Sequence, residues 1–189
     1  MTELPIQSIL EAALRVLDSR EVPYMIMGGF AVRALGIPRP TYDADLTIDA
    51  DNGLLVSLFG DFTKAGYQVP EEHRRGFKDT LAGMKKVKVQ KFEERHVWDL
   101  DLFLVTTAYQ KEAFSRRRLV PFLGAQRWMI TVEDLILHKL LANRRKDQLD
   151  VDELLRLNPS MDMSYMKRWS VELGVQERLD QALREDNQG

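Results

Sequence analysis

Two pairs of aspartates, each pair separated by one residue, lie in stretches that otherwise have the character of β-strands. Asp43 and Asp45 precede the apolar run Leu-Thr-Ile, and Asp99 and Asp101 lie in a run rich in Val, Leu and Phe. Side chains two residues apart in a strand point to the same face. A single Asp-x-Asp is most often exposed to solvent, but carboxylates in so apolar a strand need partners, because an unpaired buried charge is costly. We therefore expect two adjacent strands that present three or four carboxylates to one pocket for cations.

The composition restricts such a site to hard cations. The chain of 189 residues has no cysteine, which excludes disulfides, thiolate nucleophiles, zinc knuckles and iron–sulfur clusters. Its three histidines, His73, His96 and His138, are too scattered for a histidine-rich metal site, and we assign them no function. A metal would be held mainly by oxygen ligands, which favours Mg²⁺, Mn²⁺ or Ca²⁺.

Charge and hydropathy exclude further classes of protein. The 27 Lys and Arg residues nearly balance the 29 Asp and Glu residues, which argues against a histone-like binder of nucleic acid but allows a local basic groove. The first residues lack the basic start and apolar run of a secretory signal, and no stretch approaches the ~18 apolar residues of a membrane span. We expect a cytoplasmic protein with no membrane partner.

Strand and helix patterns mix up to residue 130, and only helix patterns follow. The pattern predicts an α/β (α+β) fold, with a small mixed β-sheet core flanked by helices at 1–130 and a helical C-terminal region at 131–189 packed on that core. Strands are predicted at 23–27, 42–48, 85–92, 96–105, 120–122 and 128–130. Helices are predicted at 6–19, 30–35, 52–64, 109–118, from Thr131 onward, at 148–157, at 163–173 and in a last segment that frays toward residue 189. Asn52 is the expected cap of the helix at 52–64, and residues 93–95 are an expected turn.

The dipeptide Gly28-Gly29 ends the first predicted strand and precedes a predicted helix. Glycine permits a ligand to approach the backbone closely, and a helix N-terminus offers unpaired N–H groups to an anion. Most such dipeptides are simply turns, so the position of this one matters more than its composition. It lies one strand away from Asp43 and Asp45, which predicts a phosphate cradle beside the cation site.

The segment that joins these features resembles the DNA polymerase β-like nucleotidyltransferase superfamily. The likeness is greatest to a small bacterial branch related to the AbiEii-type toxins of abortive-infection systems, which shows Gly-Gly or Gly-Ser, a fixed interval and Arg-x-Thr-x-Asp-x-Asp. Each of those positions is filled here, by Gly28, Gly29, Arg39, Thr41, Asp43 and Asp45. The third carboxylate of the family matches Asp101. A later helix motif of the family matches Lys139, Ala142, Arg144, Asp147 and Asp150.

The resemblance implies a reaction and a role for each matched residue. In the family, a nucleoside monophosphate moves from an NTP to a hydroxyl and pyrophosphate is released. Asp43, Asp45 and Asp101 would be the catalytic residues that hold Mg²⁺ or Mn²⁺, and Asp101 would also help as the base. The nucleotide would contact Gly28, Gly29, Arg39, Thr41 and Lys139. Asp99, Arg144 and Asp147 are secondary candidates.

The same residues also have simpler structural interpretations. Lys139 would extend to solvent from a core helix, and Arg39 would pair with Asp43 or Asp45. Thr41 would be an ordinary strand residue. The surface would then carry an ion-pair network of Arg144, Asp147 and Asp150. It would also carry a solvated helix end with Arg116, Arg117 and Arg118.

Three classes of acceptor fit the reaction: an RNA such as a tRNA 3′ end, a protein, or a small antibiotic. An RNA needs a basic surface, for which the candidates are Lys85, Lys86, Lys88, Lys91 and residues 116–118, so RNA or protein is favoured. The resemblance to the AbiEii-type toxins also implies a cognate antitoxin or toxin as a partner. One alternative is a catalytically silent nucleotide-binding or toxin–antitoxin interaction module of the same fold, and another is a metal-dependent phosphodiesterase or other hydrolase.

Overall fold

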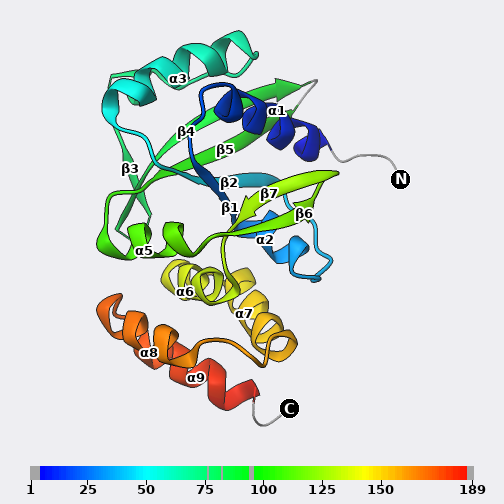
Figure 1. Cartoon of the computed structure of the whole chain (residues 1–189), viewed down its shortest axis with the longest axis vertical. Helices are drawn as coiled ribbons and strands as arrows, with labels where there is room; N and C mark the ends of the chain where they lie inside the picture. Colours follow the sequence, from blue (N-terminus) through cyan, green and yellow to red (C-terminus); the bar gives the residue numbers. More distant parts are fainter. Residues whose placement is uncertain (1–4, 76, 82, 94–95, 187–189) are drawn as a thin grey trace.

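The strand patterns of the sequence come together as one mixed β-sheet. The structure is a computed structural model that describes residues 5–75, 77–81, 83–93 and 96–186. Within these residues, the sheet has seven strands in the order β3-β4-β5-β2-β1-β7-β6 (Figure 1). β2 is parallel to β5 and β1 to β7, and the other neighbours are antiparallel. The strands are β1 (Tyr24–Met27), β2 (Asp43–Ile48), β3 (Asp79–Leu81), β4 (Met84–Glu93), β5 (His96–Leu104), β6 (Arg118–Phe122) and β7 (Ala125–Met129).

Helices gather at both ends of the molecule. Figure 1 shows α1 and α3 at one end and α6 to α9 at the other, with the sheet between them. This mixed α/β arrangement confirms the predicted fold class, whereas the boundary at residue 130 stays a prediction. The helices are α1 (Pro5–Ser19), α2 (Gly28–Ala34), α3 (Asn52–Lys64), α4 (Glu71–Arg74), α5 (Ala108–Arg116), α6 (Val132–Ala142), α7 (Arg145–Leu157), α8 (Met163–Glu172) and α9 (Gln176–Asp186). Among the described residues, no helix is long and apolar enough to cross a membrane.

Helix α6 is buried on nearly all sides because it lies between the sheet and the last helices. The hydroxyl of Thr131 accepts a hydrogen bond from the backbone N–H of Asp134 and caps the start of the helix. Asn143, in the left-handed conformation at φ 50°, ends it. A helix surrounded by protein is expected to be apolar all round. Three polar residues of α6, Asp134, His138 and Lys139, are nevertheless buried, so α6 carries polar groups into the interior.

Two local expectations about helix ends differ from the structure. Asp51 caps α3 in place of Asn52, because its carboxylate accepts the backbone N–H of Leu54. The helix predicted at 109–118 ends at Arg116, and Arg118 already begins β6. The expected turn at residues 93–95 and the fraying end at 187–189 fall largely or wholly outside the described residues.

The arginines at 116 and 117 contact protein groups and do not form a free basic helix end. The guanidinium of Arg116 lies 3.7 Å from the ring centroid of Tyr165, and its nitrogens are 3.5 Å from carboxylate oxygens of Glu133 and Asp134. Arg117 lies over the rings of Phe114 and Trp128. These contacts join α5, α6, α8 and the β6–β7 hairpin.

Candidate active site

The two Asp-x-Asp pairs lie on adjacent parallel strands at the centre of the sheet. In the register of β2 and β5, Asp43 is opposite Asp99, and Asp45 is opposite Asp101. Neighbouring strands are ~4.8 Å apart, and a parallel register keeps both pairs on one face. β1 lies on the other side of β2, where Met27 is opposite Asp45. β1, which ends at Met27 directly before Gly28, therefore ends beside Asp45.

Asp45 shows how closely these acids interact. Burial is the largest cause that raises the pKa of its carboxyl from 3.8 to about 7, and the charges of Asp43 and Asp101 contribute to the same rise. Arg144 and Lys139 act in the opposite direction. Near neutral pH, part of the Asp45 population is therefore protonated, because burial and the two neighbouring carboxylates disfavour its charged form.

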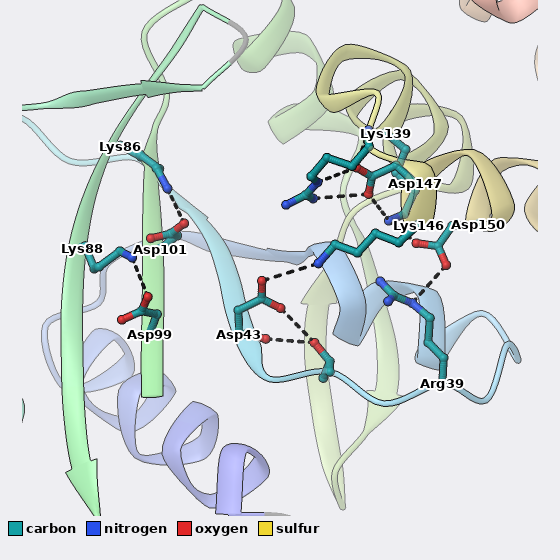
Figure 2. A network of polar contacts seen from close by, with 12 residues as sticks. Arg39, Asp43, Lys86, Lys88, Asp99, Asp101, Lys139, Lys146, Asp147 and Asp150 are labelled. Atoms are coloured by element: carbon teal, nitrogen blue, oxygen red, sulfur yellow. Dashed lines mark hydrogen bonds and ion pairs between the residues drawn. The ribbon is translucent and has the colours of Figure 1, made fainter. Parts of the chain in front are cut away.

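Two lysines of β4 neutralise the acids of β5. The Nζ of Lys86 is 2.5 Å from Oδ2 of Asp101, and the Nζ of Lys88 is 2.5 Å from Oδ2 of Asp99 (Figure 2). Burial alone would raise the pKa of Asp99, but hydrogen bonds from Lys88 and Gln90 lower it. Lys91 donates to the backbone oxygen of Ala65. Three of the four lysines proposed as an RNA surface are thus engaged with groups of the chain itself.

Gly28 and Gly29 make room for side chains of the site. At Gly28, with φ +63°, an added Cβ would lie 1.9 Å from Oδ2 of Asp45. At Gly29 it would lie 2.3 Å from Oγ1 of Thr41 and 3.4 Å from a guanidinium nitrogen of Arg39. Thr41 also donates to the backbone oxygen of Asp43 and contacts its carboxylate. The glycines let the β1–α2 turn close onto Asp45 and Thr41, a packing role that sequence reasoning did not identify.

A buried ion-pair network lies on the opposite wall. Lys139 Nζ is 2.5 Å from Oδ2 of Asp150 and 3.2 Å from Oδ1 of Asp147. Arg39 Nε is 3.0 Å from Oδ1 of Asp150 (Figure 2). Arg144 Nε is 2.6 Å from Oδ2 of Asp147. Lys139 therefore does not extend to solvent, and Arg39 pairs with neither Asp43 nor Asp45. Of the three residues expected at the surface, Asp147 and Asp150 are buried and only the Arg144 side chain is 53% exposed.

This network fixes α7 against α6 and against the loop before β2. Asp147 and Asp150 are 1% and 4% exposed, and Lys139 is 5% exposed, so each depends on the others for its charge. The three cations outnumber the two carboxylates by one. The wall that faces Asp45 therefore has a net positive charge, which suits a phosphate chain. Asp150 was part of the sequence motif but was not singled out as a site residue.

A cavity lies between these two walls. Its polar lining comprises Gly28, Asp45, Lys139, Arg144 and Asp147, and its apolar lining Met27, Met84, Phe103, Leu135 and Ala142, with His138 between them. His138 is 6% exposed, and neither ring nitrogen has a hydrogen-bond partner. Burial lowers its pKa to about 4, so the ring is neutral at pH 7. Sequence reasoning missed His138 because nothing in one sequence separates it from a packed core histidine.

The donor set fits a divalent cation without surrounding one. Among the described residues, no three His, Cys, Asp or Glu side chains are grouped closely enough to hold a metal ion. Asp101 nevertheless has an enclosed Oδ1 with no hydrogen-bond partner. The carboxylate of Asp43 is 42% exposed and 3.9 Å from the Nζ of Lys146. Carboxylate oxygens are the ligands that Mg²⁺ and Mn²⁺ prefer, and Oδ1 of Asp101 is free to accept such a cation.

Comparison with known proteins identifies the fold. No family model and no curated protein matches the sequence. A candidate nucleotidyltransferase from Thermotoga maritima superposes with a TM-score of 0.55 at 11% identity, over 82% of this chain and 95% of its own. ANT(2")-Ia, crystallised with adenylyl-2"-tobramycin, superposes with a TM-score of 0.58 at 16% identity, over 88% of this chain and 95% of its own. A solution structure of the antibiotic-resistance factor ANT(2")-Ia gives a TM-score of 0.59. At these identities the likeness shows a shared fold.

Proposed function

We propose that this chain with a nucleotidyltransferase fold is a metal-dependent nucleotidyltransferase. It moves a nucleoside monophosphate from an NTP to a hydroxyl of an acceptor and releases pyrophosphate. The observation that carries the proposal is the register that sets Asp45 beside Asp101, with the backbone of Gly28 against Asp45. The relation to the AbiEii-type branch is part of the proposal and rests on the motif from Arg39 to Asp45.

The residues would divide the work between the two walls of the cavity. Asp43, Asp45 and Asp101 would hold Mg²⁺ or Mn²⁺, which supplies charge neutralisation at the leaving oxygen and acidifies the attacking hydroxyl. Asp101 would accept the proton of that hydroxyl as its oxygen bonds to the α-phosphorus and the bond to the β-phosphate breaks. Lys139 and Arg144 would bind the β- and γ-phosphates. Binding there would draw both cations partly away from Asp147.

A small-molecule acceptor is supported by a groove next to the cavity. Met84 lines both spaces, and the groove also contains Tyr109, Trp169 and Glu172. Aromatic faces with one carboxylate suit a hydroxylated, cationic molecule. The structural neighbour ANT(2")-Ia carries an adenylylated aminoglycoside. The engagement of Lys86, Lys88 and Lys91 leaves less basic surface for RNA, so a small molecule becomes the first acceptor class to test.

Label transfer from each α-³²P NTP, with Mg²⁺ or Mn²⁺, tests the proposal. Pooled aminoglycosides and other antibiotics, total RNA and a protein extract serve as separate acceptor pools. We expect label in one pool with the wild-type chain and none with the Asp45→Asn variant. Metal-dependent NTP binding without label in any pool would favour the catalytically silent module or the need for a toxin–antitoxin partner. Absence of NTP binding would reject the nucleotide-based proposal.

A further inference from the structure

One cation of the chain already lies on a proposed metal ligand. The Nζ of Lys86 is 2.5 Å from Oδ2 of Asp101, and the two side chains are only 12% and 16% exposed. The second oxygen of Asp101, Oδ1, is enclosed and accepts no hydrogen bond. A buried carboxylate oxygen without a partner is costly. Asp101 is therefore half neutralised, with one oxygen facing a lysine and one oxygen available to a further positive charge.

The neighbouring pair, Lys88 and Asp99, differs from Lys86 and Asp101 in exposure and in the partners of its carboxylate. The distance between Nζ and Oδ2 is the same, but these side chains are 31% and 36% exposed. The second oxygen of Asp99 accepts a hydrogen bond from Nε2 of Gln90 at 2.9 Å. Both oxygens of Asp99 thus have partners and partial contact with solvent. The difference between the two pairs lies in the position of Asp101, which is opposite Asp45 in the sheet.

We propose that Lys86 is the internal counter-ion of the cation site, and that its ammonium leaves Asp101 when a divalent cation binds. This proposal rests on the proposed function. An ammonium and a divalent cation on one carboxylate would repel each other strongly at this degree of burial. The lysine side chain is a flexible chain of four carbons, so the ammonium can move away from Asp101 while β4 stays in place. Lys86 Nζ also lies 5.8 Å from the ring centroid of Phe103, a second surface that favours a cation.

Lys86 would then act as a positioning residue with two consequences. While the site is empty, its charge offsets the repulsion among Asp43, Asp45 and Asp101, and it holds Asp101 by one oxygen. When the cation arrives, displacement of the ammonium from Asp101 subtracts from the affinity. Lys86 therefore sets how much Mg²⁺ or Mn²⁺ is needed to fill the site. Removal of the Lys86 charge should lower the stability of the metal-free protein and raise its affinity for the metal, two effects of opposite sign.

Titration of the full chain with Mn²⁺, followed by the electron paramagnetic resonance signal of the free ion, tests this exchange. We expect Lys86→Met to bind Mn²⁺ at least about tenfold more tightly than the wild type at physiological salt. Lys88→Met is the matched control, and screening should limit its change to about threefold. Lys86→Arg keeps the charge and should bind no more tightly than the wild type. Mn²⁺ should also raise the melting temperature of Lys86→Met more than that of the wild type.

The other outcomes distinguish failure of the exchange from failure of the proposed metal site. If the wild type binds Mn²⁺, Asp45→Asn does not, and Lys86→Met gains no more affinity than Lys88→Met, the exchange is rejected and the proposed function stands. If neither the wild type nor any variant binds Mn²⁺, the proposed metal site and the exchange both fail. Lys86→Gln repeats the measurement with a polar replacement, and circular dichroism confirms that each variant is folded.

Discussion

Replacement of Asp45 by asparagine should make the protein more stable while it removes activity. Asp45 is partly buried beside Asp43 and Asp101, and its pKa is raised from 3.8 to about 7. Asparagine has nearly the same shape and cannot ionise, so it fits the same space without the repulsion. A carboxylate retained where it destabilises the fold is the expected signature of a functional residue.

The magnitude and its pH dependence follow from the pKa. The rise of the pKa from 3.8 to about 7 sets a ceiling of about 4 kcal/mol on the gain in stability, and partial contact with solvent reduces the expected gain to about 2–4 kcal/mol. The folded state keeps a proton that the unfolded state releases between pH 3.8 and about 7. The stability of the wild type relative to the variant is therefore greatest at low pH and is lost as the pH rises through that window.

Urea unfolding in the presence of a chelator measures this effect. The advantage of Asp45→Asn should be largest near pH 8, smaller near pH 5 and absent near pH 4. Asp99→Asn is the matched control, because hydrogen bonds from Lys88 and Gln90 hold the pKa of Asp99 low despite its burial, so the same substitution should destabilise. The reasoning is refuted if Asp45→Asn is no more stable than the wild type at pH 8, or if its advantage does not change with pH.

Three further outcomes are expected. Gly28→Ala should abolish Mn²⁺ binding, because the backbone is at φ +63° and the added Cβ would lie 1.9 Å from Asp45. Gly124→Ala, at φ +71° in open space, should keep Mn²⁺ binding and lower the stability only by the backbone strain of about 1–2 kcal/mol. Equal effects of the two variants on Mn²⁺ binding would exclude Asp45 as the cause. Lys139→Met leaves two buried carboxylates without their shared cation and should lower the free energy of unfolding by about 3–5 kcal/mol in urea; a loss below ~1 kcal/mol would show that the network does not fix α7. Saturating Mg²⁺ should raise the melting temperature of the wild type and leave that of Asp45→Asn unchanged; equal shifts would place the metal elsewhere.

The sequence predicts the fold well where local patterns decide the structure. The stripe of apolar residues in α1 and the apolar runs of β1, β2 and β5 identify these elements because burial imposes their periodicity. The charged segment from residue 71 to 81 has no such period, and α4 and β3 were not predicted. The cap of α3 was misplaced by one residue because Asp51 and Asn52 are both good caps, and only the backbone decides between them.

The candidate site depends on contacts that no single sequence shows. The motif placed Asp45 and Asp101 on strands, but their register comes from how β2 and β5 pair. Lys86 and Lys88 were interpreted as exposed positive charge, because an alternating strand does not reveal which acids lie on the next strand. The partner of Arg39 is Asp150, more than a hundred residues away along the chain. Pairing across such separations is a property of the folded chain.

Nucleotidyl transfer, the central claim, is tested most directly by following the label of the same NTP carrying ³²P at the α- or at the γ-position. With an accepted substrate and Mg²⁺, the label of the α-³²P NTP should appear in the acceptor, and the label of the γ-³²P NTP should appear in pyrophosphate in equal amount. Asp45→Asn should produce neither. Label from the γ-position in the acceptor would indicate a kinase, and α-label in free nucleoside monophosphate with no labelled acceptor would indicate a hydrolase; either result would contradict nucleotidyl transfer.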